Sequence, residues 1–116
     1  MDLYTYQLEK TNCVWAMGIP YIDSTVKSGH PLLAPTWDIV MGVKSGKLSP
    51  DQYNEVYWAI MRERYHHCPE FFDWIISHKS FAFGCYCQPG KFCHRHELVK
   101  FFSEITEVKY CGEITR

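Results

Sequence analysis

Three of the chain's six cysteines and two of its six histidines lie in one segment, FAFGCYCQPGKFCHRH, which spans residues 81–96. Thiols and imidazoles are side chains that proteins use as nucleophiles, bases and zinc ligands. The apolar run at residues 81–87 predicts a short strand, and the apolar spacing over residues 97–104 predicts a helix. We therefore expect residues 93–96, CHRH, at a helix N-terminus that faces the end of a strand, and we expect the chemistry of the protein there.

The cysteines and histidines of this segment allow two kinds of chemistry. Three thiolates and one imidazole could hold a tetrahedral zinc ion, although structural zinc sites usually space their cysteine pairs more widely than C-x-C. The predicted zinc ligands are Cys85, Cys87, Cys93 and His96. Alternatively, Cys93 would have a lowered pKa at the helix N-terminus and act as a nucleophile, with His94 or His96 as its base. In a third interpretation the cysteines are small apolar residues of the core.

Polar and cationic side chains follow two of the predicted strands. In open α/β sheets ligands bind where strands end and helices begin, because backbone N–H groups and the helix dipole favour an anion there. The sequence therefore predicts a phosphate or nucleotide pocket between two loops. Its predicted ligand-binding residues are Asp23, Thr25, Lys27, Ser28 and Gly29 in the first loop and Gly90, Lys91 and Arg95 in the second. The simpler alternative is that these residues are solvated charges and ordinary turns.

The elements that must position these residues alternate between strands and helices. Strands are predicted at residues 3–8, 19–22, 81–87 and 107–114, and short helices after Thr36 and at residues 70–77. A longer helix starts at Ser49-Pro50-Asp51, because serine is a preferred cap and proline suits the first helical position. This alternation predicts a single α/β domain over residues 1–116, small and three-layered, with a partly parallel sheet flanked by helices.

Composition limits the class of protein. The 116 residues are 47% hydrophobic and 16% aromatic, which predicts one packed domain with Trp37 and Trp74 mostly in its core. No apolar run is long enough to span a membrane and the first residues do not resemble a signal peptide, so we expect a soluble cytoplasmic protein. In a reducing compartment we expect its cysteines to be thiols or metal ligands and not a disulfide framework. The formal net charge of -1 argues against a general nucleic-acid-binding surface.

The most specific motif is C-Y-C-x-x-G-x-F-C-H-R at residues 85–95. It is accompanied by Asp23–Gly29 with its T-V-K-S-G loop, Ala34–Trp37, Lys44–Gly46, Tyr53 with Tyr57, and Tyr110–Ile114. Together these segments resemble a phage branch of the domain-of-unknown-function family 488. The resemblance spans nearly the whole chain. It implies a small α/β domain, often carried by bacteriophages, in which the T-V-K-S-G loop and the C-H-R helix start form one site, and it implies no particular reaction.

The leading hypothesis is a protein that binds a nucleotide-like or other phosphorylated small molecule and sequesters or processes it in the cytoplasm of a host cell. Whether it is an enzyme is left open. The predicted roles are anion binding for Lys27, Lys91 and Arg95, and catalysis or pocket shaping for Cys93 and His94. One alternative is a non-enzymatic inhibitor of a host defence protein, with cysteines and histidines that are structural or hold zinc. Another is a nucleic-acid-binding protein, which needs a local basic face.

Overall fold

The computed structural model describes residues 1–86 and 93–115, and within these ranges it contains four β-strands and five α-helices. The strands are β1 (Asp2–Gln7), β2 (Tyr21–Asp23), β3 (Ser80–Cys85) and β4 (Lys109–Ile114). The helices are α1 (Thr11–Ala16), α2 (Trp37–Lys44), α3 (Pro50–His67), α4 (Pro69–Ile76) and α5 (His94–Ile105), and a short 3-10 helix, η1 (Leu8–Lys10), leads into α1.

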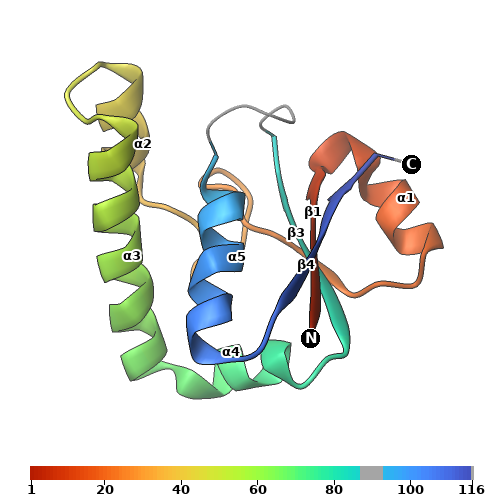
Figure 1. Ribbon diagram of the computed structural model, residues 1–116. Helices are drawn as coiled ribbons and strands as arrows, with labels where there is room; N and C mark the ends of the chain where they lie inside the picture. The colour runs from red at the N-terminus through yellow and green to blue at the C-terminus, as the bar shows by residue number, and fades with distance from the viewer. Residues whose placement is uncertain (87–92, 116) are drawn as a thin grey trace.

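The four described strands form one parallel sheet in the order β2-β3-β1-β4. Figure 1 shows α1 on one side of this sheet and α2, α3 and α5 on the other, which gives three layers. The prediction of a small α/β domain is confirmed, and the described sheet is wholly rather than partly parallel. Because parallel strands all end at the same edge, the carboxyl ends of β2 and β3 lie beside each other, and β3 leads toward the start of α5.

The main core fills the space between the sheet and the layer of α3, α4 and α5. Its buried residues include Leu3, Tyr57, Met61, Phe72, Phe81, Phe83, Leu98 and Phe102. A smaller cluster on the α1 side contains Tyr6, Val14, Ala82 and Ile114. The central strand β3 contributes side chains to both clusters, and this explains why its sequence is a continuous apolar run instead of an alternating pattern.

The positions of two tryptophans correct the expectation from composition. Trp37 on α2 and Trp74 on α4 are 54% and 51% exposed, so the prediction that they lie mostly in the core was wrong. Each of these short helices buries only one face, and other residues occupy it: Ile39 on α2, and Phe72 and Ile75 on α4. The aromatic content indicated that a core exists, but it could not indicate which aromatic rings fill it.

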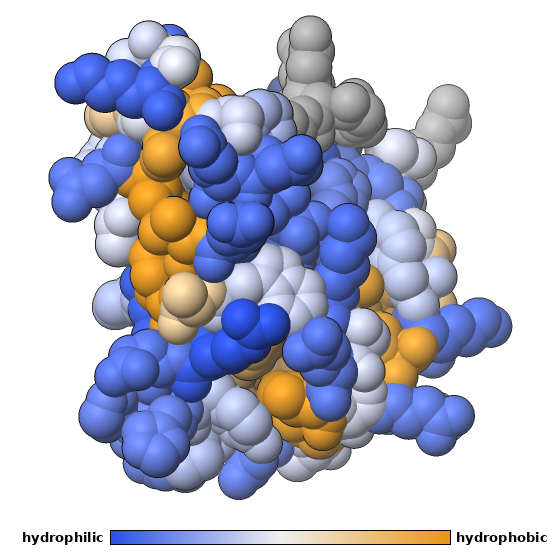
Figure 2. All heavy atoms as spheres, turned by 60° about the vertical axis from the view of Figure 1, so that its left-hand side comes forward, coloured by the Kyte–Doolittle hydropathy of each residue, from blue (hydrophilic) through white to orange (hydrophobic). Residues whose placement is uncertain are grey.

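Apolar side chains also reach the surface on the side of the molecule where α2 and α3 lie (Figure 2). The exposed apolar residues of these two helices include Met41 and Val56. Within the ranges that the structure describes, no helix combines the length and the apolar character that a membrane crossing requires.

Candidate functional site

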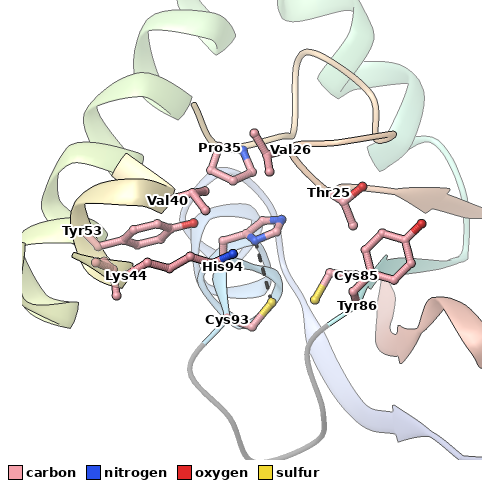
Figure 3. Close-up of a pocket in the computed structure, with 11 residues that line it drawn as sticks. Thr25, Val26, Pro35, Val40, Lys44, Tyr53, Cys85, Tyr86, Cys93 and His94 are labelled. Carbon is pink, nitrogen blue, oxygen red and sulfur yellow. Dashed lines mark hydrogen bonds between the residues drawn. The ribbon is translucent and has the colours of Figure 1, made fainter. Parts of the chain in front are cut away.

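A pocket of about 310 Å³ opens where β2 and β3 end and α5 begins. Its wall also includes side chains from α2 and from the first turn of α3, as Figure 3 shows. The lining residues are Thr25, Val26, Pro35, Val40, Val43, Lys44, Tyr53, Cys85, Tyr86, Cys93 and His94. This is the edge at which open parallel sheets bind their ligands.

A cysteine and a histidine form a pair on one side of this pocket. The Nε2 atom of His94 lies 2.6 Å from the backbone oxygen of Ser24 and 3.1 Å from its Oγ atom. Because a carbonyl oxygen can only accept a hydrogen bond, Nε2 carries a proton. In the neutral imidazole the other nitrogen, Nδ1, keeps its lone pair, and it lies 3.7 Å from the Cys93 sulfur. This tautomer can accept a proton from the thiol.

The orienting residue Ser24 is fixed by the sheet. It follows the last residue of β2, it is fully buried, and its backbone N–H and its Oγ both donate to the carbonyl of Gly84 on β3, at 2.9 and 2.8 Å. The imidazole of His94 is therefore held against a rigid part of the backbone. The sequence could not identify this orienting group, because the acceptor is a main-chain carbonyl that any residue type carries.

The structure places Arg95, which was predicted to bind an anion, in the interior of the protein with a side chain that is 0% exposed. Its Nε and Nη2 atoms donate to the two carboxylate oxygens of Glu113 at 3.1 and 2.7 Å, and its Nη1 atom donates to the Cys85 sulfur at 2.7 Å. Arg95 is not among the residues that line the pocket. Its link to the pocket is its hydrogen bond to Cys85, which does line it. A direct contact between Arg95 and a ligand stays a prediction.

The Glu113 carboxylate is held in its charged form. Burial alone would raise its pKa, but the hydrogen bonds from Arg95 and Thr5 and the charge of Arg95 outweigh burial and lower the pKa below its ordinary value of 4.5. Burial likewise acts to lower the pKa of Arg95, and the Glu113 hydrogen bonds together with the neighbouring Cys85, Cys93 and Glu113 raise it overall. The result is an ion pair behind the pocket in which Arg95 is fully buried and Glu113 is largely buried.

A β-bulge in β4 directs Glu113 toward Arg95. Between the pairings Leu3 with Tyr110 and Thr5 with Glu113, β1 advances two residues and β4 advances three. Gly112, with φ of 100°, supplies the left-handed conformation that this extra residue requires. As a result the side chains of Tyr110 and Glu113 both bond the Thr5 hydroxyl. Sequence reasoning missed the role of Glu113, although it lies in the matching segment Tyr110–Ile114.

The loop after β2 is stabilised by its own polar groups. The carboxylate of Asp23 accepts hydrogen bonds from the Thr25 N–H at 2.8 Å and from the Ser28 hydroxyl at 2.6 Å, and a Cβ at Gly29 would lie 2.3 Å from the Thr25 nitrogen. Asp23, Ser28 and Gly29 thus shape a tight turn. Thr25 faces the pocket, whereas Lys27 is exposed and is not among its lining residues in the described part of the chain.

Lys44, at the end of α2, supplies a cation that sequence reasoning did not assign to the site. Its side chain lines the pocket, and Figure 3 shows it extending toward His94 and Cys93. The sequence feature that could have identified Lys44 was the segment Lys44–Gly46, which is one of the segments that resemble the family. Its place in the site depends on how α2 packs against α3, which local sequence does not reveal.

The predicted zinc ligands are only partly described. Cys87, Gly90 and Lys91 lie outside the described residues, so their predicted roles stay predictions. Cys85 and Cys93 both line the pocket, whereas the ring of His96 packs edge-on against Tyr110 of β4, with the centroids 6.4 Å apart. Burial and the charge of Arg95 lower the pKa of His96. Within the described residues, no three His, Cys, Asp or Glu side chains are grouped so that they could hold a metal ion.

The fold and the site place this chain in the class of small parallel α/β domains that have a Cys–His pair and a pocket at the ends of their strands. The chain belongs to the DUF488-N3a family, described as the active DUF488-N3 subclade, whose model matches residues 10–106. The match includes the loop after β2, the Cys93–His94 pair and Arg95, and it ends before β4. No curated protein and no solved structure matches the chain.

Proposed function

We propose that this protein binds a phosphorylated, nucleotide-like small molecule in the pocket and holds it against the thiol of Cys93. The observation that carries the proposal is the Cys93–His94 pair, in which the Ser24 carbonyl sets the imidazole tautomer and the pair opens on a pocket that contains Lys44. A base with a defined tautomer next to a thiol at a helix start is the arrangement of an activated sulfur nucleophile.

The phosphate is proposed to bind at the N-terminus of α5. Cys93 is the residue before this helix, and its side chain makes no capping hydrogen bond. The dipole of a helix of this length favours an anion at its start, and the ammonium group of Lys44 adds a full positive charge nearby. Lys27 and Lys91 keep their proposed roles as cations that attract the ligand to the pocket.

The base or another ring of the ligand is proposed to bind against the apolar part of the wall. Val26, Pro35, Val40 and Val43 form this part, and the ring of Tyr53 borders it. The volume of about 310 Å³ is near the lower end of the range for small-molecule pockets, roughly 300 to 1,000 Å³. A mononucleotide or a phosphorylated sugar suits this size better than a dinucleotide does.

The resemblance to phage proteins motivates a use for this site. A phage protein of this kind would sequester or process a host nucleotide in the cytoplasm of the infected cell. Processing would use the proton transfer from Cys93 to Nδ1 of His94, which leaves a thiolate beside the bound ligand. Sequestration needs only the pocket and its cations.

The test is a calorimetric and thermal-shift titration with nucleoside monophosphates, sugar phosphates and inorganic phosphate. We expect one of the organic phosphates to bind and Lys44→Gln to weaken its binding by about ten-fold, which corresponds to about 1.4 kcal/mol. The matched control is Lys47→Gln, because Lys47 is exposed and is not among the lining residues of the pocket in the described part of the chain. Absence of any response to the panel would refute the proposal.

A second function, binding of a host protein, is favoured by the exposed aromatic side chains. Trp15 is 72% exposed, and Trp37 and Trp74 are about half exposed; aromatic residues are enriched at protein interfaces. This function predicts a complex with one purified host protein that survives Cys93→Ala and is weakened by Trp15→Ala. Loss of such a complex in Cys93→Ala would instead assign the contact to the pocket.

A further inference from the structure

The proposed function gives no role to one of the two pocket cysteines. Cys85, the last residue of β3, lines the same pocket as Cys93, and Figure 3 shows both side chains at this site. Cys85 belongs to a strand at the centre of the sheet, whereas Cys93 is the residue before α5. The pocket thus holds two sulfur atoms on separate, well-anchored elements.

Each of the two sulfurs has its own activating neighbour. The Cys93 sulfur lies 3.7 Å from Nδ1 of His94, which can take its proton. The Cys85 sulfur accepts a hydrogen bond from the Arg95 guanidinium at 2.7 Å. A guanidinium stabilises the thiolate form of a neighbouring cysteine, and Glu113 keeps this guanidinium in place with two hydrogen bonds. The pocket therefore contains one thiol with a base and one thiol with a fixed cation.

We propose that Cys93 and Cys85 together carry out thiol–disulfide exchange with a low-molecular-weight disulfide. The Cys93 thiol gives its proton to His94, and the thiolate attacks one sulfur of the disulfide. A bond forms between Cys93 and that sulfur, the disulfide bond breaks, and the leaving thiolate takes the proton back from His94. The product of this first step is a mixed disulfide at Cys93.

In the second step the Cys85 thiolate, stabilised by Arg95, attacks the Cys93 sulfur. A bond forms between Cys85 and Cys93, the mixed disulfide bond breaks, and the second small thiolate leaves with the proton that Cys85 has given up. In total, two protein thiols are oxidised to one disulfide, and one small disulfide is reduced to two thiols. The reaction needs no phosphorylated ligand, so it goes beyond the proposed function.

The experiment treats the reduced full-length protein with hydroxyethyl disulfide and measures the intact mass and the peptide map after the remaining thiols are alkylated. The protein carries Cys111→Ser, because the thiol of Cys111 is exposed. We expect a loss of two hydrogen atoms and a mapped disulfide between Cys85 and Cys93. In Cys85→Ala the reaction should stop at the mixed disulfide on Cys93, and in Cys93→Ala no disulfide between two protein cysteines should form.

The matched control is Cys13→Ala on α1, which lies on the other side of the sheet from α5 and should behave like the parent protein. A disulfide that contains Cys87 in place of Cys85, a stable mixed disulfide in the parent protein, or no reaction at all would overturn the proposal. Failure of phosphate binding would leave all of these outcomes unchanged, so the two proposals can be judged separately.

Discussion

The starts of α3 and α5 are built in opposite ways. At α3, the Ser49 hydroxyl accepts a hydrogen bond from the Gln52 N–H at 3.1 Å, and the Gln52 side chain accepts one from the Ser49 N–H at 2.9 Å. At α5, the residue in the same position is Cys93, which makes no capping hydrogen bond and has its sulfur near His94. The start of α3 is capped by its own side chains, whereas the start of α5 carries the thiol and the imidazole that could do chemistry.

The contacts that stabilise the start of α5 therefore come from other elements of the fold and not from the cap residue. The buried pair of Arg95 and Glu113 anchors the first turn of α5 to β4, and His94 anchors it to the end of β2 through Ser24. In this protein, tertiary contacts hold the helix start that has a reactive residue in its cap position. Four predictions test it, from the largest expected effect on stability to the smallest.

Replacing Arg95 should have the largest effect. Arg95→Met leaves the largely buried Glu113 carboxylate without its cation, which should cost about 3 kcal/mol of unfolding free energy, the lower end of the range for buried pairs. Denaturant unfolding measures this loss. The double change Arg95→Met with Glu113→Leu should recover most of it, and Arg62→Met, at an exposed arginine, should cost far less. A loss of under about 1 kcal/mol for Arg95→Met would contradict the anchoring role.

Acid should weaken the same anchor. The pKa of Glu113 is lower in the folded protein than the ordinary 4.5, so the carboxylate adds stability above pH 4.5 that is lost as the pH falls through the folded pKa. Below pH 4.5, the midpoint temperature of thermal unfolding should therefore fall less steeply with decreasing pH in Glu113→Gln than in the parent protein. The control is Glu55→Gln, which changes an exposed carboxylate on α3.

Removing the cap of α3 should have a moderate effect. Ser49→Ala should cost about 1 kcal/mol, because it leaves the Gln52 N–H without its partner. Thermal unfolding measures the change, and the rate at which iodoacetamide alkylates Cys93 should stay the same. An altered alkylation rate would mean that the two helix starts are coupled.

Replacing Cys93, the cap residue of α5, should have the smallest effect on stability and should abolish the reactions of its thiol. In Cys93→Ser, the gain of a preferred capping residue offsets the cost of burying a hydroxyl, so we expect a change within about 0.5 kcal/mol. The protein should lose alkylation at this position and the disulfide between Cys85 and Cys93. Severe destabilisation would show that the sulfur is needed for packing.

The parts of the fold that could be predicted from sequence are those determined by neighbouring residues. The start of α3 follows from Ser49-Pro50-Asp51, and the strand and helix around residues 81–105 follow from apolar spacing. Strand boundaries were less accurate: β2 was expected at residues 19–22 and occupies Tyr21–Asp23. Short strands contain too few residues for their alternation to define their ends.

The site was harder to predict because its partners come from distant parts of the chain. The motif indicated Cys93 and His94, and the structure brings them to a pocket. The carbonyl of Ser24, the cation of Lys44 and the carboxylate of Glu113 depend on how strands pair and helices pack. The sequence predicts that Arg95 binds an anion, and it could not indicate that the structure pairs Arg95 with Glu113 inside the protein; the ligand contact itself stays a prediction.

The bulge at Gly112 makes the site sensitive to the length of β4 as well as to its composition. In a regular strand, residues three positions apart point to opposite faces of the sheet, so without the bulge the Glu113 carboxylate would point away from Thr5 and Arg95. Relatives of this protein can therefore be sorted by this spacing together with the glycine. A chain that keeps tyrosine and glutamate three positions apart, with glycine between them, keeps the anchor of its reactive helix. A chain with the same spacing and no glycine must hold that arginine in some other way, and a chain with a spacing of two needs no bulge.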